Sequence, residues 1–297
     1  MAALDTQYQY VNLSTHYNSS SNFHETRLNF NSTESLHPHD EHTLVSVERF
    51  LLRKVRLPLF EVPPTPWAVR GGDGDGTELD LDDIVDSSGF GYSYIDFVIS
   101  LRDALLAEDV ITASDHLKLD TEGRIYFIHT GVATSVEFNA QLATDLNIFH
   151  YNNFQQPNNE WYTLAVQPDL EVSSDDAYQS FGTVTDLFPV DSIIFRSDDI
   201  PIEREKLNVG SGATSRTIAS ITDFQLTAPD SLSSINTISF ITDMRRYHSL
   251  INGINQQFHI FVEYQSVNGK RRVLQTASGG SSSIKILLES RGQLLES

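Results

Sequence analysis

Residues 257–275, QFHIFVEYQSVNGKRRVLQ, contain the pattern that indicates the fold. Residues 257–265 are rich in aromatic and β-branched side chains, which is typical of a strand, and residues 272–275 form a second, shorter strand candidate. Asn268-Gly269 lies between the two candidates. This pair is a strong hairpin signal because both residues tolerate a positive φ. The stretch therefore predicts an antiparallel β-hairpin.

Further strand candidates lie on both sides of this hairpin, separated by turn signals. They are residues 25–30, 43–52, 161–166, 191–195, 217–226, 235–241 and 282–288. Together with residues 257–265 they make eight main strands, to which residues 272–275 add an extension. Eight antiparallel strands in two sheets are the number found in a jelly roll. The sequence therefore predicts an all-β protein with a single jelly-roll sandwich.

One segment departs from this strand pattern. Ser93 is a candidate helix cap with Asp96 three residues later, and Phe97, Leu101 and Leu105 follow at helical spacing. Residues 124–129 and 134–138 are typical of strands, and residues 141–146 are typical of a second short helix. Helical and strand patterns are thus mixed in this segment.

These patterns predict three parts of the chain. Residues 25–66 and 156–297 are expected to form the jelly-roll domain, and residues 67–155 a mixed α/β insertion. The proline cluster at residues 63–66 marks the exit from the sheet, because proline cannot donate a ladder hydrogen bond. Residues 1–24 are polar and aperiodic, so we expect a flexible N-terminal arm.

The charge of the chain is concentrated in its middle. The net charge is −20, and residues 66–210 alone contain 27 acidic and 7 basic residues. Residues 241–297 contain 7 basic and 4 acidic residues. A strongly acidic surface repels phosphate backbones, which argues against direct binding of nucleic acid. No stretch approaches the roughly 18 apolar residues of a transmembrane segment, and the absence of cysteine excludes disulfides and thiolate metal sites.

Two clusters contain residue types that bind metals. The acidic loop with Asp73, Asp75, Glu78, Asp80, Asp82 and Asp83 fits either a calcium site or a solvated loop. An EF-hand that begins at Asp73 would need glycine where Glu78 stands. His37, His39 and His42 occur together with Asp40 and Glu41, which fits either a zinc site or a turn between strands. We expect no metal and no cofactor.

Catalytic motifs are absent from the sequence. It contains no Gly-x-Ser-x-Gly elbow, His-Glu-x-x-His, P-loop or Gly-x-Gly-x-x-Gly. We therefore expect no catalytic residue and no enzyme activity. The basic groups Arg245-Arg246 and Lys270-Arg271-Arg272 fit either solvated sheet edges or a docking site for an acidic protein surface.

Several segments resemble the penton (minor capsid) proteins of virophages and of Polinton-like (Maverick) elements. The C-terminal part carries most of the likeness, with a strand, an Asn-Gly turn and a Gly/Ser run before Ser-Ile-Lys. The segments are Arg245-Arg246-Tyr247, Ile251, residues 258–264, Asn268-Gly269 and residues 279–288. Residues 193–203, 94–105 and 138–149 also look alike.

The resemblance implies a structural capsid protein. It also implies that the chain forms homopentamers at the five-fold vertices of an icosahedral virion, next to a double jelly-roll major capsid protein. It further implies a virion protein that is assembled in the host cell cytoplasm. The acidic insertion could then face outward and contact a host receptor.

Two other classes of protein remain as alternatives at this point. A β-sandwich carbohydrate-binding protein or metal-dependent cupin-like enzyme is one, for which His37–His42 is the visible support. A trimeric tail or fibre adhesin is the other, supported by the Asn-, Ser- and Thr-rich N-terminus.

Overall fold

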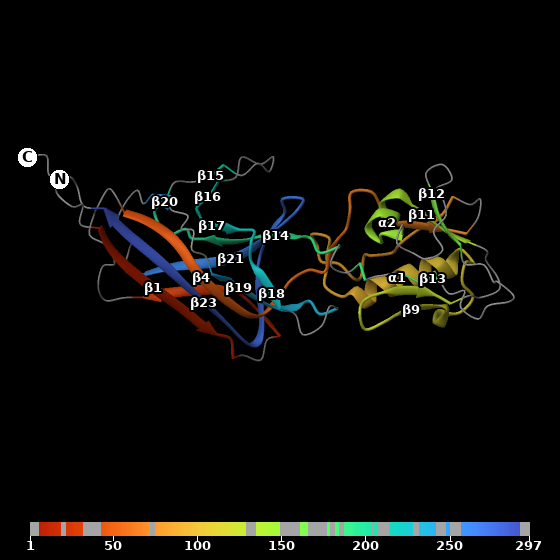
Figure 1. Ribbon diagram of the computed structural model, residues 1–297, viewed down its shortest axis with the longest axis horizontal. Helices are drawn as coiled ribbons and strands as arrows, with labels where there is room; N and C mark the ends of the chain where they lie inside the picture. The colour runs from red at the N-terminus through yellow and green to blue at the C-terminus, as the bar shows by residue number, and fades with distance from the viewer. Residues whose placement is uncertain are drawn as a thin grey trace, which may run out of the picture. The chain divides into compact units, whose positions relative to one another are not determined.

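The computed structural model of the chain divides into two compact units. Unit 1 comprises Met1–Leu57, Val190–Ala228 and Ile235–Ser297, and unit 2 comprises Pro58–Pro189 and Pro229–Ser234. The structure describes residues 6–18, 22–31, 43–71, 75–128, 135–148, 161–165, 177–178, 182–183, 187–202, 205–206, 214–227, 232–241, 248–249 and 257–291. Figure 1 shows the elements of both units.

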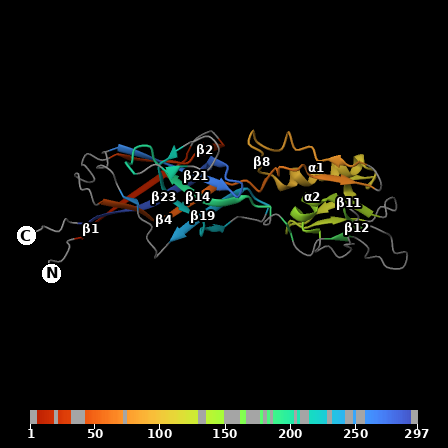
Figure 2. The ribbon, with the colours of Figure 1, turned by 90° about the horizontal axis from the view of Figure 1, so that it is seen from above.

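Unit 1 contains a seven-stranded antiparallel sheet, called sheet A. Its order is β1 (Thr6–His16), β23 (Gln275–Arg291), β4 (Thr43–Arg56), β19 (Ile235–Ile241) and β18 (Gln225–Thr227). Two short strands complete it, β2 (Phe23–Glu25) beside β23 and β20 (His248–Ser249) beside β4. In Figures 1 and 2, β1, β23 and β4 run next to one another as long strands.

The second sheet of unit 1, sheet B, has five antiparallel strands. Its order is β17 (Thr217–Ile221), β14 (Val190–Arg196), β21 (Gln257–Ser266) and β22 (Arg271–Val273), with β3 (Arg27–Asn31) beside β21. A separate two-stranded pair consists of β15 (Glu205–Lys206) and β16 (Thr214–Ser215). The predicted hairpin is confirmed: β21 pairs with β22, and Gly269 has a φ of 80°.

The core of unit 1 lies between the two sheets. The ring centroid of Phe50 on β4 is 4.9 Å from that of Phe195 on β14, so side chains of the two sheets meet. Along β19, Ile238 and Phe240 are buried while Thr237 and Ser239 are only half-buried. This period of two is that of a strand with one face in a core. The predicted all-β jelly-roll sandwich is confirmed, but residues 161–166, one of the eight strands predicted for it, are wrong as a sandwich strand, because residues 161–165 pair within unit 2. Strands β1, β2 and β20 are sandwich strands that the sequence did not predict.

Unit 2 mixes short strands with two helices. Its four-stranded sheet has the order β12 (Trp161–Ala165), β11 (Ser135–Asn139), β6 (Ala68–Arg70) and β7 (Thr77–Glu78). Its three-stranded sheet has the order β13 (Ala177–Tyr178), β10 (Ile125–Phe127) and β9 (Leu117–Leu119). The remaining elements are the pair β5 (Phe60–Glu61) and β8 (Phe90–Gly91), α1 (Tyr94–Ala107), α2 (Ala140–Asp145) and the 3-10 turn η1 (Ser114–His116).

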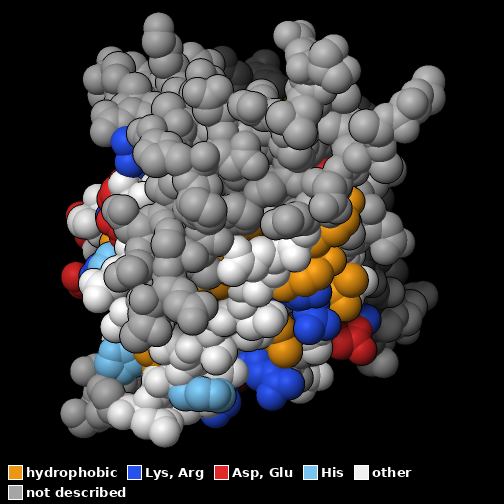
Figure 3. Space-filling model, turned by 90° about the vertical axis from the view of Figure 1, so that its left-hand side faces the viewer, with side chains coloured by type: hydrophobic (Ala, Val, Ile, Leu, Met, Phe, Trp, Pro, Cys, Tyr) orange, Lys and Arg blue, Asp and Glu red, His pale blue; other side chains and the backbone are white. Residues whose placement is uncertain are grey.

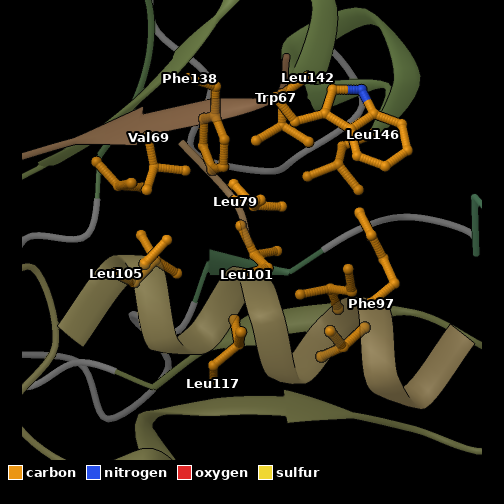
Figure 4. Packing of buried hydrophobic residues seen from close by; sticks show 14 of the residues in the cluster. Trp67, Val69, Leu79, Phe97, Leu101, Leu105, Leu117, Phe138, Leu142 and Leu146 are labelled. Atoms are coloured by element: carbon orange, nitrogen blue, oxygen red, sulfur yellow. The ribbon is translucent and has the colours of Figure 1, made fainter. Parts of the chain in front are cut away.

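Helix α1 contributes six buried side chains to the core of unit 2. The Ser93 side chain accepts a hydrogen bond from the Asp96 backbone nitrogen, which confirms the predicted cap. Phe97, Leu101 and Leu105 are fully buried, as their helical spacing predicted. Figure 4 shows these three side chains pointing from the helix toward side chains of the four-stranded sheet and of α2. This part of the core therefore lies between α1 and these elements, while Leu117 of β9 packs on the other side of the helix.

The structure differs from the predicted N-terminal arm, residues 1–24. Strand β1 lies in this segment and pairs with β23 from Thr6↔Arg291 to His16↔Ser281. Val11 and Leu13 are its buried hydrophobic side chains. Two apolar residues between Tyr, Asn and Ser are a weak local pattern, and the pairing partner lies at the other end of the chain.

The structure also divides the two units at other residues than predicted. Unit 2 begins at Pro58 instead of residue 67, because Leu59 and Phe60 belong to its core. It extends to Pro189 instead of residue 155. The reason is that β12 and β13 pair with β11 and β10 of unit 2.

Candidate interaction surfaces

The two units differ strongly in charge. Unit 2 contains 24 acidic and 4 basic residues, a net charge of −20. Unit 1 contains 16 acidic and 16 basic residues and is neutral overall. The excess negative charge of the chain thus belongs to unit 2, which makes this unit a poor surface for phosphate backbones.

Unit 2 has an acidic groove of about 380 Å³ along α1. The carboxylates that line it come from the helix, from β7 and from the segment after β7; they are Glu78, Asp80, Asp83, Asp96 and Asp103. Ile99 lines the groove as well, and the side chain of Ile95, one turn earlier on α1, is 53% exposed. We refer to the groove together with Ile95 as the α1 groove.

The metal candidates from the sequence are only partly described by the structure. Asp73 and the cluster His37–His42 lie outside the described residues. Asp75, Glu78, Asp80, Asp82 and Asp83 are described, and Asp80 Oδ1 accepts a hydrogen bond from the Asp82 backbone nitrogen. Among the described residues, no group of three His, Asp or Glu side chains is placed to hold a metal ion. The support for a cupin-like enzyme therefore rests on residues outside this part of the chain.

A polar network stiffens the outer face of sheet B. Arg196 Nε donates to Glu263 Oε1 at 2.9 Å, and Arg196 Nη1 donates to Asp198 Oδ1 at 2.8 Å. The guanidinium also lies 4.9 Å from the ring centroid of Phe261, whose other cationic neighbour is Arg27 at 5.1 Å. Burial lowers the pKa of Arg196, but the bonds to the two carboxylates outweigh it and raise the pKa above its usual value.

The outer face of sheet A is more apolar. It has a groove of about 330 Å³ that crosses β1, β23, β4 and β19. Leu51, Ser239 and Ile241 line it, together with the cationic side chains Arg49 and Lys285. We call it the sheet A groove. In Figure 3, which shows one end of the molecule, hydrophobic side chains also lie directly beside Lys and Arg.

Sequence reasoning missed both the sheet A groove and the Arg196 network. The groove forms only when four strands from distant parts of the chain lie side by side. The only sequence signal for the groove was the alternation along residues 235–241. Phe240 is buried, so the next residue, Ile241, lies on the solvent side of the same strand.

The basic groups of the sequence have different surroundings. Arg245-Arg246 lie outside the described residues. Lys270 is exposed after the β21–β22 turn, and its carbonyl accepts a hydrogen bond from the Ser266 nitrogen at 2.9 Å. Arg271 Nε donates to Gln265 Oε1 at 2.8 Å, so Arg271 braces the hairpin. Lys270 and Arg272 remain as candidates for contacts with a partner.

Comparison with protein families decides the identity of the chain. The family model of the Sputnik minor capsid protein V18/19 matches residues 118–290, which is more than half of the chain. The chain belongs to the Sputnik minor capsid protein V18/19 family.

Two solved structures share the fold of this chain over nearly its whole length. A crystal structure of the mavirus penton protein is similar with a TM-score of 0.74 at 20% identity, over 96% of this chain and 99% of that chain. A chain of the Sputnik virophage structure from cryo-electron microscopy has a TM-score of 0.64 at 14% identity, over 96% and 98%. A search of curated proteins found no match.

Membership in the V18/19 family confirms the resemblance to virophage penton (minor capsid) proteins. The V18/19 protein is a capsid component of a virion, and its role is structural. Among the described residues, no helix is long and apolar enough to cross a membrane.

Proposed function

We propose that five copies of this chain form a homopentamer that closes the five-fold vertices of an icosahedral virion. The similarity to the mavirus penton protein over nearly the whole of both chains carries this proposal. The neighbours at the vertex would be double jelly-roll major capsid proteins, and assembly would take place in the host cytoplasm. The acidic unit 2 would meet a host receptor, without a catalytic residue, metal or cofactor.

The two outer faces of unit 1 fit such a ring. A closed ring of identical subunits uses heterologous contacts, in which one surface of a subunit meets a different surface of the next. Sheet A presents an apolar groove with cationic side chains, whereas sheet B presents the ion-paired network around Arg196. Because the two faces of the sandwich differ, they support head-to-tail contacts more than contacts between two copies of the same face.

Size-exclusion chromatography with light scattering tests the pentamer. We expect a particle of about five times the 33.3 kDa of one chain. A trimer would instead favour a fibre protein, and a monomer or dimer at every concentration would contradict the vertex role.

Reversing the charge of Lys270 and Arg272 is expected to slow assembly more than it weakens the finished pentamer. Exposed ion pairs contribute only about 0–1 kcal/mol each, but they steer encounters at low salt. Arg271 is left unchanged because it holds Gln265. The variant Lys270→Glu/Arg272→Glu should assemble slowly in about 0.01 M salt, and the deficit should shrink at about 0.1 M, where the Debye length is roughly 10 Å.

The control for this experiment is Lys118→Glu, which reverses an exposed cation on β9 of unit 2. Stopped-flow light scattering gives the rates. Equal rates for parent and double variant in both salts would show that Lys270 and Arg272 are only a solvated edge.

A further inference from the structure

Exposed hydrophobic side chains gather in two places on this chain. Seven large hydrophobic side chains are exposed among the described residues: Tyr8, Tyr10, Ile95, Ile99, Leu226, Ile241 and Val267. Tyr8, Tyr10 and Ile241 lie on strands of sheet A, and Ile95 and Ile99 lie on α1. Ile241 is 81% exposed, the largest value of the seven. Single exposed apolar residues are ordinary, but groups of them mark interaction sites.

Strand register places Ile241 on the outer face of sheet A. Ile241 pairs with Arg49 of β4, and its neighbour Phe240 pairs with Phe50, whose ring faces sheet B. Because side chains alternate along a strand, Ile241 and Arg49 point away from the core. Arg49 in turn pairs with Lys285 of β23. The exposed Ile241 thus lies in a row with two cationic side chains.

Small residues create the hollow beside this row. Leu51 of β4 has Ser239 of β19 on one side and Ser283 of β23 on the other. All three line the sheet A groove. Two serines next to a leucine leave space that larger side chains of a partner can fill.

The charge around the sheet A groove is cationic. The exposed charged side chains of β4 are Arg49, Arg53 and Lys54. Glu48 on the same strand is half-buried, and its carboxylate is bound to Lys285 Nζ at 3.0 Å. A partner that fits this surface must therefore be apolar and anionic.

The same chain presents such a surface on unit 2. The α1 groove combines the exposed Ile95 and Ile99, which lie one helical turn apart, with five carboxylates. Asp83 is among them, and its side chain is exposed. Apolar contact supplies affinity, while opposite charges set the register of two surfaces. The sheet A groove and the α1 groove are therefore complementary both in apolar contact and in charge.

We propose that the sheet A groove of one copy binds the α1 groove of a second copy. This contact is heterologous, because each copy uses one patch of each kind, and repeated contacts of this kind form a ring when the rotation from one copy to the next closes. The inference rests on the proposed homopentamer and names two of the surfaces that hold it together.

The test measures the concentration at which the oligomer dissociates, by light scattering of a dilution series. Ile241→Ser should raise the dissociation constant roughly tenfold or more, because it removes a buried apolar side chain from the interface. The matched control is Val267→Ser, which removes another highly exposed side chain, 69% accessible, at the β21–β22 turn. It should match the parent. Thermal unfolding shows that both variants are folded.

A charge exchange tests whether the α1 groove is the surface that binds the sheet A groove. Arg49→Glu and Asp83→Lys should each weaken the oligomer, and the double variant should recover most of the parent's affinity. Parent affinity in Ile241→Ser, or a double variant as weak as the sum of its parts, overturns the inference while the pentamer stands. A parent that is monomeric throughout overturns the proposed function itself.

Discussion

Replacing Phe97 with alanine is expected to lower the free energy of unfolding of unit 2 by about 3–5 kcal/mol. Phe97 on α1 is fully buried, and its ring centroid lies 5.1 Å from Trp67, 5.5 Å from Phe60 and 5.5 Å from Tyr94. Truncation removes these contacts and leaves a cavity that a close-packed core fills only in part. The size of the loss follows from the position of Phe97 among three other aromatic rings.

Tryptophan fluorescence during urea unfolding measures this loss for unit 2 alone. The chain has two tryptophans, Trp67 and Trp161, and both belong to unit 2. The control is Lys118→Ala, which truncates an exposed side chain on β9 of unit 2. It should change stability by no more than about 0.5 kcal/mol, the usual range for surface positions. Similar losses in both variants would contradict the assigned core.

Replacing Arg196 with alanine is expected to destabilise unit 1 by about 3 kcal/mol. Glu263 is only 8% exposed, and its carboxylate accepts a hydrogen bond from Arg196 Nε. Removing one member of a buried ion pair leaves a charge without compensation, which is far costlier than losing an exposed pair. The contact of Arg196 with the Phe261 ring is lost as well.

A double-mutant cycle separates the ion pair from the packing. Glu263→Gln removes the charge, so Arg196→Ala/Glu263→Gln should be more stable than the sum of the single losses implies. Hydrogen exchange of the β14 and β21 amides reports on unit 1, and Arg53→Ala, an exposed arginine on β4, is the control. Strict additivity would show that the two side chains do not depend on each other.

Local patterns predicted several elements because neighbouring residues decide them. Ser93 and the spacing of Phe97, Leu101 and Leu105 were enough for α1, since a cap and a buried face are set within four turns. Asn268-Gly269 was enough for the β21–β22 hairpin, since the turn itself requires a positive φ.

Other features depend on partners that the sequence does not bring together. No pattern in the sequence around Gly91 indicates that a glycine is required there. In the structure Gly91 pairs with Phe60, and a Cβ atom at this position would clash with the Phe60 ring at 1.9 Å. The Arg196–Glu263 pair joins two strands of sheet B that lie far apart in the chain. Neither contact has a local pattern that predicts it.

The sequence by itself determined the fold class, the helix α1, the hairpin and the resemblance to virophage penton proteins, because each depends on short-range periodicity or short motifs. Only the tertiary structure decided that the N-terminal segment is strand β1, that unit 2 begins at Pro58, and that Ile241 and Arg49 share one groove. The first and the last depend on strand pairing between residues far apart in the sequence, such as Thr6 with Arg291 and Arg49 with Ile241. The second depends on the packing of Leu59 and Phe60 in the core of unit 2. Pairing of that kind is selected by the burial of whole faces, which no local pattern records.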